Sequence, residues 1–569
     1  MGQKKNLKQG LQKPKTQLKV SKTIQDWKWL DQSSYFLLGI LIILICVIRA
    51  NFFNTPFERD EGEYFYLGQL ILDGKIPYID FFELKLPGIY YSYGLIVLLF
   101  GANVQGAHQA FLVINILTIL IMFFIGKKLF NNISAFIIAF SFAFLSLSPQ
   151  MSGFTTQSEH LVIFIVSGAF LLLIYALENI KYWYMFLLSG ILMGYSLLVK
   201  QNAVFFILIG GLAIILHCYL AKPISWKEML KNCLMYAAGV FIAIGVMIWI
   251  MYRLGALKEM WYFTVVLVKK FMLVVPFNDG FKEFRSKWVI VTENYYFYWI
   301  SALFGLLLIS ITKRTLSFKL SIWLAALLSF LSIFPGLHFY GHYWIQLTPI
   351  LALLNGIAFY TLTELLKAKH NPNYSKLLLL SIFIVFSILH LNIQREYYFR
   401  PGKAKLIKEV YLMNPFTESK IMADYIKART TKGDQIAVLG SEPQIFFYTG
   451  CRSVSKHHYL SFLMTDSLEF PQNKRFQSEF IHDVETKKPK YMIYYKIPVS
   501  WMPQLRSLKD IEKWFPAFAY KNYNIVGIAD MVTADRTEYI WKEDAMAYQP
   551  KGEYFVAVFE RKTETKSPI

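Results

Sequence analysis

The sequence predicts a polytopic α-helical membrane protein with a small extracytoplasmic α/β domain at its C-terminal end. Of the 569 residues, 55% are hydrophobic and only 17% are charged, whereas soluble domains hold about 25% charged residues. About eleven apolar runs are long enough to cross a bilayer, which takes roughly 17–25 residues per helix. After residue 395 these runs stop, and short β-type runs alternate with amphipathic ones. This pattern excludes an ordinary cytosolic enzyme and a disordered protein.

The predicted spans follow one another along the first two thirds of the chain. They cover residues 34–50, 107–126, 133–150, 160–177, 183–199, 203–220, 233–252, 296–312, 318–336, 343–366 and 376–393. No small-residue cleavage signature follows the first run, so we interpret it as a retained helix and not as a signal peptide.

The net charge of +21, from 59 Lys and Arg against 38 Asp and Glu, fits this interpretation. In a soluble protein such an excess would indicate nucleic-acid binding. In a membrane protein Lys and Arg concentrate in cytoplasmic loops. The lysine-rich region 1–33, in which Asp26 and Asp31 are the only acids, is therefore predicted to be cytoplasmic. We expect no nucleic-acid partner.

The segment 86–101, LPGIYYSYGLIVLLFG, decides the topology. If it does not cross, the short outer loops carry only Lys200. The basic residues of the cytoplasmic loops are then Lys127, Lys128, Lys181, Lys222, Lys227, Lys231, Lys313, Arg314, Lys319, Lys367, Lys369 and Lys376. This distribution obeys the positive-inside rule, so we predict that 86–101 is a juxtamembrane or partly inserted helix on the outer side. In the long outer loop 253–295, Lys269 and Lys270 favour an interfacial helix over a span.

Three regions result: a cytoplasmic N-terminus (1–33), a transmembrane domain (34–395) whose first outer loop is 51–106, and an extracytoplasmic α/β domain (396–569). In the last region, strands are predicted at QIAVLG, KYMIYY, YNIVGI, TEYIWKE and EYFVAVF, and helices at SKIMADYIKART and NKRFQSEFIHDVE. The four cysteines form no CxxC pair, which argues against a zinc site and a disulfide framework.

Charged residues gather at the outer ends of the predicted spans. The densest cluster is Arg59-Asp60-Glu61-Gly62-Glu63, followed by Glu83-Leu84-Lys85. Ionisable residues beside a bilayer usually have a function, and Asp60 or Glu61 could act there as a general base. The alternative is a solvated loop that begins a helix, since acids stabilise helix N-termini.

The string RDEGEYFYLGQLILDGKIPYIDFFELKLPGIYY, residues 59–91, resembles the first outer loop of bacterial polyprenyl-phosphate-sugar glycosyltransferases. These are GT-C enzymes of glycosyltransferase family 39, related to protein O-mannosyltransferases and lipid A aminoarabinose transferases. The segments GFTTQSEHLVIF, GYSLLVKQNAVFF, FYGHYWIQLTPILALL and SKIMADYIKARTTKGDQIAVLGSEPQIFFYTG resemble further parts of the family. Two positions depart from it: Leu86 stands where the family has proline, and Gly341 precedes His342.

The resemblance implies a GT-C fold, a plasma membrane location in a bacterium, and a donor sugar on a polyprenyl phosphate at the outer leaflet. Asp60 would take the proton of the acceptor hydroxyl, with inversion at the sugar, and Glu61 is the second catalytic candidate. Lys85 and Lys200 would meet the phosphate. The remaining substrate-binding candidates are Glu83, Glu159, Gln201, His342 and Tyr343. The acceptor would be a lipid, glycan or protein, and no metal or other cofactor is expected.

Each candidate has a structural alternative. Lys85 and Lys200 could extend to lipid headgroups, and Glu159 could cap the helix that starts beside it. His338 and His342 have the i,i+4 spacing of a helical metal site, but Gly341 and the lack of a third ligand argue against one.

Three other functions are compatible with a polytopic chain. A transporter or flippase usually places ionisable residues at mid-membrane in paired halves, which this sequence does not do. A polysaccharide polymerase or ligase would also use a lipid-linked donor, and the third alternative is a non-catalytic assembly or receptor protein. The paired acids of the first outer loop favour the transferase.

Overall fold

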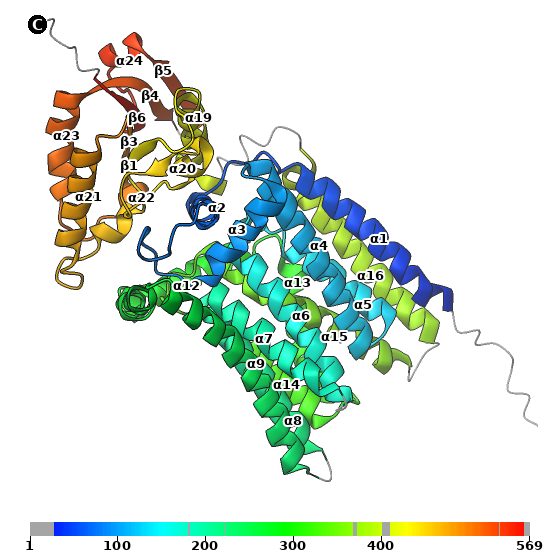
Figure 1. The fold of residues 1–569 in the computed structure, drawn as a ribbon. Helices are drawn as coiled ribbons and strands as arrows, with labels where there is room; N and C mark the ends of the chain where they lie inside the picture. Colours follow the sequence, from blue (N-terminus) through cyan, green and yellow to red (C-terminus); the bar gives the residue numbers. More distant parts are fainter. Residues whose placement is uncertain are drawn as a thin grey trace, which may run out of the picture.

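A computed structural model describes residues 28–179, 182–221, 224–367, 372–400, 410–533 and 535–562. Figure 1 shows a bundle of helices that run roughly side by side, with a sheet domain at one end of it. The chain has the architecture of a polytopic α-helical membrane protein. The basic residues before 28, and Lys181, Lys222 and Lys369, lie outside the described residues.

Within the described residues, seven helices are long and apolar enough to cross a membrane, or eight if one bent pair is a single span. They match seven of the predicted spans. Four are single helices that the spans fill almost or wholly: α4 (Val104–Leu129), α6 (Ser158–Glu178), α9 (Trp226–Arg253) and α1 (Lys28–Ala50, spanning from Ser33). The others are η3 with α8 (Val204–Leu220), spanning Gln201–Leu220; η6 (Gly341–Leu347) with α15 (Thr348–Lys367), spanning Gly341–Lys367; and α16 (Pro372–Ile393), spanning Tyr374–Ile393. Side-chain caps start several of them; Asn103, for example, accepts a hydrogen bond from the Gly106 amide at the start of α4.

The other four predicted spans form shorter apolar helices: α5 (Asn132–Leu145), α7 (Trp183–Val199), α13 with η5 (Tyr296–Ile311) and α14 (Leu316–Leu331). For 133–150 and 318–336 the predicted end is too late. A serine-containing turn and Pro149 follow α5, and a turn with Pro335-Gly336 follows α14. Proline and glycine disfavour helix continuation, so both helices end earlier than predicted. All four pack against long helices of the bundle, for instance α7 against α9 and α13 against α15.

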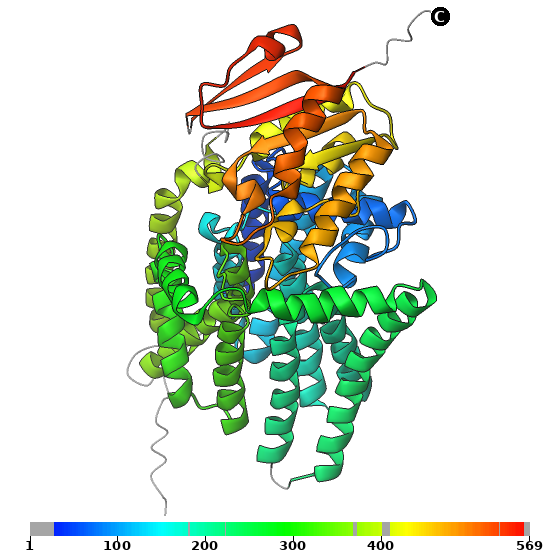
Figure 2. The ribbon, with the colours of Figure 1, turned by 90° about the vertical axis from the view of Figure 1, so that its left-hand side faces the viewer.

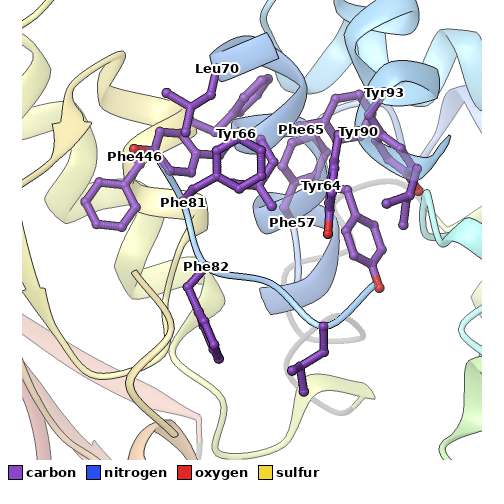
Figure 3. Packing of buried hydrophobic residues seen from close by; sticks show 14 of the residues in the cluster. Phe57, Tyr64, Phe65, Tyr66, Leu70, Phe81, Phe82, Tyr90, Tyr93 and Phe446 are labelled. Atoms are coloured by element: carbon purple, nitrogen blue, oxygen red, sulfur yellow. The ribbon is translucent and has the colours of Figure 1, made fainter. Parts of the chain in front are cut away.

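The region predicted as the first outer loop contains two helices, α2 (Arg59–Leu72) and α3 (Gly88–Phe100). Figure 1 places both at the end of the bundle that faces the sheet domain. Their aromatic side chains pack together with Phe81, Phe82 and Phe446 in one buried cluster (Figure 3). Because Phe446 comes from the C-terminal domain, this cluster joins the two parts of the molecule.

The long loop 253–295 forms two helical segments that meet at 85°. The first comprises α10 (Leu257–Trp261), η4 (Tyr262–Leu267) and α11 (Val268–Met272), and the second is α12 (Phe277–Thr292). In Figure 2 the first segment, green, runs across the bundle just below the C-terminal domain. Its direction matches the predicted interfacial helix, and its side chains Val268 and Phe271 reach the site described below.

The C-terminal domain contains a six-stranded sheet in the order β2-β1-β3-β6-β4-β5. The strands are β1 (Gln435–Leu439), β2 (Arg452–Ser453), β3 (Tyr491–Lys496), β4 (Tyr523–Thr533), β5 (Arg536–Trp541) and β6 (Tyr554–Arg561). Strand β1 pairs in parallel with β2 and β3, and the other pairs are antiparallel. The helices include α19 (Phe416–Lys427), α20 (Gln444–Thr449), α21 (Asn473–Lys487), α22 (Pro498–Trp501), α23 (Asp510–Asn522) and α24 (Glu543–Ala547). The predicted α/β alternation is thus observed, with strand β2 and the helices α20, α22, α23 and α24 in addition.

The C-terminal domain is docked on α2 by close backbone contact and by polar bonds. A Cβ on Gly62 would lie 2.2 Å from Cβ of Gln444, so only glycine permits this approach. Arg59 forms an ion pair with buried Glu442 (2.6 Å), and the Ser453 amide donates to the hydroxyl of Tyr66 (2.8 Å). Helix α2 therefore lies between the bundle and the sheet domain and fixes their relative position.

Candidate functional site

A cavity of about 280 Å³ lies where the bundle meets the C-terminal domain. Its lining comes from α2, the loop after it, the start of α8, α11, η6 and the C-terminal domain. The polar lining residues include Asp60, Glu83, Lys85, Lys200, Gln201, His342, Tyr343, Tyr459, Ser461 and Gln504. Seven of the nine predicted site residues are thus brought together, and an eighth, Glu159, forms an ion pair with Lys200.

Asp60 lies in the first turn of α2 and lines the cavity. The Tyr459 hydroxyl donates a long hydrogen bond to its Oδ1 atom (3.5 Å). Burial raises the pKa of Asp60, but Lys85 and then His342 and Lys200 outweigh this effect, and the resulting pKa lies below its usual value. Asp60 is therefore a carboxylate at neutral pH, and it can accept a proton.

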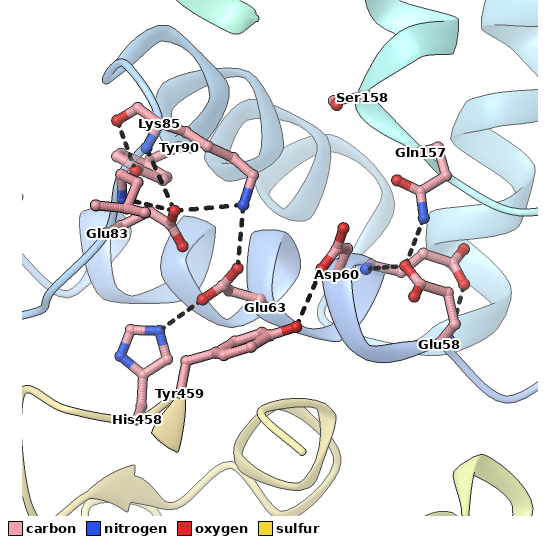
Figure 4. Close-up of polar contacts among 12 residues, drawn as sticks. Glu58, Asp60, Glu63, Glu83, Lys85, Tyr90, Gln157, Ser158, His458 and Tyr459 are labelled. Carbon is pink, nitrogen blue, oxygen red and sulfur yellow. Dashed lines mark hydrogen bonds and ion pairs between the residues drawn. The ribbon is translucent and has the colours of Figure 1, made fainter. Parts of the chain in front are cut away.

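Lys85 lies between two buried acidic side chains (Figure 4). Its Nζ atom lies 3.3 Å from Oε1 of Glu83 and 3.5 Å from Oε2 of Glu63. It also lies 5.0 Å from the centre of the Tyr64 ring. Burial lowers the pKa of Lys85, but the nearby charged Glu83 outweighs this and raises it above the usual value, so the ammonium stays charged.

Glu63 and His458 were not predicted as site residues. His458 Nδ1 lies 3.2 Å from the Lys456 carbonyl oxygen, and its Nε2 atom lies 3.0 Å from Oε1 of Glu63. Burial lowers the pKa of His458 to about 4, so the ring is neutral at pH 7. The carbonyl oxygen can only accept, so Nδ1 carries the proton and Nε2 accepts one from Glu63. Burial and the nearby Glu83 raise the pKa of Glu63, which agrees with a protonated carboxyl group.

Glu83 is the charged member of this group. Its Oε1 atom accepts hydrogen bonds from the Leu84 amide (2.7 Å) and from Lys85, and these partners outweigh burial and lower its pKa. The oxygens and nitrogen of Glu63, Glu83 and His458 lie within 4.8 Å of one another, close enough to bind a metal ion. The Lys85 ammonium lies 3.3–3.5 Å from two of these side chains, so the same group also forms an ion-pair network.

A second cationic group comes from the bundle. Lys200, at the end of α7, forms an ion pair with Glu159, which is fully buried in the first turn of α6. The Lys200 ammonium also lies 4.6 Å from the centre of the Tyr343 ring. Nε2 of His342 is 3.9 Å from Glu159. Glu159 thus positions Lys200 at the cavity, a more specific contact than the helix cap considered as its alternative.

Gln201 connects the two cationic groups. Its side-chain amide donates a hydrogen bond to the carbonyl oxygen of Leu84 (3.0 Å), next to Lys85. Gly88 packs against the backbone of Leu198, where a Cβ would approach to 2.7 Å. The loop that carries Lys85 is therefore fixed against the end of α7 that carries Lys200, so both ammonium groups reach the cavity.

Glu61 does not line the cavity. Its Oε1 atom accepts from the Thr156 hydroxyl (2.6 Å) and backbone amide, and its Oε2 atom from the Glu58 amide (2.9 Å) in a capping box. Burial raises the pKa of Glu61 to about 7, although the hydrogen bonds from Thr156 lower it. These contacts favour a structural role, the fixing of α2 to the bundle, over the catalytic role expected from the sequence.

Comparison with solved structures identifies the fold. ArnT from Cupriavidus metallidurans in the apo state has a TM-score of 0.52 at 12% identity, over 93% of this chain and 98% of that one. The same protein bound to undecaprenyl phosphate scores 0.51 at 12% identity, over 82% and 93%. The archaeal oligosaccharyltransferase AglB from Archaeoglobus fulgidus, in complex with an inhibitory peptide and a dolichol-phosphate, scores 0.51 at 13% identity, over 91% and 74%. No curated protein sequence matches the chain.

A comparison with family models indicates which enzymes the sequence resembles. Residues 85–252 match the model of the dolichyl-phosphate-mannose-protein mannosyltransferase family. Together with the GT-C fold, this match makes the chain a membrane glycosyltransferase. The resemblance to this family is thereby confirmed, over a segment that begins at Lys85 and includes Glu159, Lys200 and Gln201.

Proposed function

We propose that the protein transfers a sugar from a polyprenyl-phosphate donor to an acceptor hydroxyl, on the outer side of a bacterial plasma membrane, with inversion at the anomeric carbon. One observation carries the proposal: a carboxylate, Asp60, and two ammonium groups, Lys85 and Lys200, line the same cavity at one end of an apolar bundle. A base for the acceptor and cations for the leaving phosphate are the two requirements of this reaction.

In the proposed reaction the acceptor oxygen forms a bond to the anomeric carbon while the bond from that carbon to the phosphate oxygen breaks. Asp60 takes the hydroxyl proton, and the electron pair of the broken bond leaves with the polyprenyl phosphate. The lowered pKa of Asp60 supports this role, because the group is unprotonated when the acceptor binds. A positioned base typically contributes a factor of about 10²–10⁴ to the rate.

Lys85 and Lys200 would bind the phosphate and stabilise the charge that grows on it as the sugar leaves. Each is held by buried carboxylates on one side and faces the cavity on the other. The GT-C neighbour ArnT has been solved with undecaprenyl phosphate, a lipid monophosphate of the proposed kind. A monophosphate needs less neutralisation than a pyrophosphate, so two lysines suffice and we expect no divalent metal.

The hydrocarbon chain of the donor has a suitable groove in the bundle. A mainly apolar cavity of about 470 Å³ lies among α4, α6, α8, α14 and α15. Its lining includes Gln346 and Phe206, which lie three and four residues after the site residues Tyr343 and Asn202. A polyprenyl chain in this groove would place its phosphate near the two lysines.

The acceptor would be a hydroxyl of a lipid, glycan or protein that reaches Asp60 in the cavity. A transporter is disfavoured because the buried Arg49 is saturated by Asn115 (3.3 Å) and by the carbonyl of Gly153 (3.1 Å), which indicates a structural role. The N-terminus would be cytoplasmic and the C-terminal domain extracytoplasmic, as the charge distribution predicts.

Mutation of Asp60 tests the proposal directly. Purified protein in liposomes is given undecaprenyl-phosphate-linked sugars and the glycans, glycolipids and proteins of the host envelope, and products are read by mass spectrometry. Asp60→Asn is expected to lower transfer by roughly 10²–10⁴-fold, whereas Asp424→Asn, on the exposed face of α19, leaves it unchanged. Full activity of Asp60→Asn would exclude the assigned base, and absence of transfer by the wild-type protein with every donor would exclude the function.

A further inference from the structure

The active-site cavity is closed on one side by the C-terminal domain. The segment Tyr459–Thr465 and residues Met502 and Gln504 form that wall. Tyr459 packs on Phe462 (4.9 Å between ring centres), and Phe462 packs on Phe82 and Phe271 (5.8 Å each). This wall is therefore supported by the first outer loop and by α11, and it is not a loose flap.

Two consecutive residues of this domain contact two acids one helical turn apart on α2. His458 accepts from Glu63, and Tyr459 donates to Asp60 (Figure 4). The register is fixed by neighbouring bonds: the Phe82 amide donates to the Lys456 carbonyl (3.0 Å), and the Ser461 amide donates to the Ser441 hydroxyl (2.7 Å). Arg59, next to Asp60, donates to the Ser441 carbonyl. These bonds fix the backbone before and after Tyr459, and the Tyr459 side chain therefore lies over Asp60.

We propose that Tyr459 is a positioning residue of the transfer reaction: its hydroxyl holds the Asp60 carboxylate toward the cavity, so that the C-terminal domain completes the active site. No other hydrogen bond to the Asp60 side chain is found among the described residues. Without such a bond, a carboxylate on the first turn of a helix can occupy more than one staggered χ1 rotamer. Burial raises the pKa of Tyr459 well above its usual value, so the phenol remains a donor at every working pH.

The electrostatic surroundings of Asp60 include groups from every neighbouring element. They are Arg59, Glu58, Glu61, Glu63 and Tyr64 of α2 and its cap, Tyr93 of α3, Lys85 of the following loop, Lys200 at the end of α7, Tyr340, His342 and Tyr343 at η6, and Tyr459. The lysines, arginine and His342 lower the pKa of Asp60 by charge. Tyr459 adds a neutral donor, whose loss would raise that pKa.

The variant Tyr459→Phe keeps the ring and removes the donor. We expect kcat to fall roughly ten-fold, as for a lost hydrogen bond to a charged group, with the KM for the lipid donor nearly unchanged. The acidic limb of the pH profile of kcat should move upward by about half to one pH unit. Tyr520→Phe is the matched control, since Tyr520 lies in the same domain and is 86% exposed.

A second readout needs no turnover and separates this inference from the proposed function, on which its kinetic part rests. A carbodiimide reacts with protonated buried carboxyl groups, and tandem mass spectrometry locates the modified Asp60 in intact protein. Tyr459→Phe should increase this labelling at a fixed acidic pH, and Tyr520→Phe should not. If the wild-type protein transfers no sugar but the labelling changes, the proposed function fails and the contact stands.

If the wild-type protein is active while Tyr459→Phe matches it in kcat, pH limb and labelling, the inference is overturned. Phe462→Leu gives an independent arm for the case in which Tyr459→Phe does not fold. It keeps the hydroxyl and removes the ring that supports Tyr459, and we expect a smaller shift of kcat and labelling in the same direction. Wild-type behaviour of Phe462→Leu in that case would also contradict the proposal.

Discussion

At the residue scale, the two carboxyl groups beside Lys85 have different protonation states. Glu63 is protonated and donates to neutral His458, whereas Glu83 is charged and balances the ammonium group. Neither assignment follows from the sequence, in which all these acids look alike. Glu63 lies three residues after Asp60, on the same face of α2, and this spacing is the only sequence signal that could have identified it.

This difference predicts unequal effects of two isosteric substitutions. In Glu63→Gln the amide can replace the carboxyl proton in the bond to His458, so stability and transfer should change little. In Glu83→Gln the Lys85 ammonium loses its charged partner, which should cost about 1–3 kcal/mol of stability and most of the activity. Thermal unfolding in detergent and transfer assays compare the two; equal losses in both variants would contradict the assigned protonation states.

Metal removal tests the role of Lys85 as the resident cation. Because its ammonium lies 3.3–3.5 Å from the carboxylates of Glu83 and Glu63, we expect a chelator to leave the transfer rate unchanged. The measurement compares rates after dialysis against EDTA with rates after addition of Mg²⁺, Mn²⁺ or Zn²⁺. A loss with EDTA that a divalent ion restores would show that the Glu63, Glu83 and His458 group binds metal in the active protein.

At the scale of single elements, α2 has the central position. One face presents Asp60 and Glu63 to the site, and another presents Gly62 to the backbone of α20 at a distance that no side chain allows. The hydrophobic periodicity of the sequence predicts little about this helix, because nearly every residue of it is buried. Its three neighbours, the bundle, α3 and the sheet domain, leave it no solvent face.

The packing of α2 predicts the effect of Gly62→Ala. The added Cβ would lie 2.2–2.4 Å from Cβ and Cα of Gln444, so α2 and α20 must separate. We expect a loss of about 1–3 kcal/mol in stability, as in other overpacked cores, together with a lower kcat because Tyr459 moves away from Asp60. Gly245→Ala in α9 is the control, since nothing lies within 4 Å of its Cβ position. Equal thermal stability of the two variants would exclude close packing at Gly62 as a requirement.

At the scale of the whole molecule, hydropathy predicts the bundle well and its ends less well. The seven long spans are set by continuous apolar runs, whereas the ends of α5 and α14 depend on turns that interrupt such runs. The sheet domain was predictable from its alternation, but the two-residue strand β2 was not. The pairs His458–Glu63 and Tyr459–Asp60 could not be predicted, since they join positions 395 and 399 residues apart.

The orientation of the molecule is a testable prediction of the charge pattern. Reporters that are active only outside the cytoplasm, fused after residue 105 and after residue 400, should both be active. A reporter fused in the loop after α4, beside Lys127 and Lys128, should be inactive. Inactive reporters at both 105 and 400, with an active one after α4, would mean that α3 crosses the membrane or that the whole topology is reversed. Opposite results at 105 and 400 would mean that an odd number of spans lies between them.

The long separation between α2 and its partners also has a consequence for biosynthesis. A chain leaves the ribosome from its N-terminus, so Asp60 and Glu63 reach their side of the membrane when His458 and Tyr459 have not yet been made. Until the sheet domain follows and docks, the base has no tyrosine above it and Glu63 has no histidine. On the proposed mechanism, a nascent or truncated chain therefore lacks part of the site, and we expect sugar transfer only when synthesis has finished.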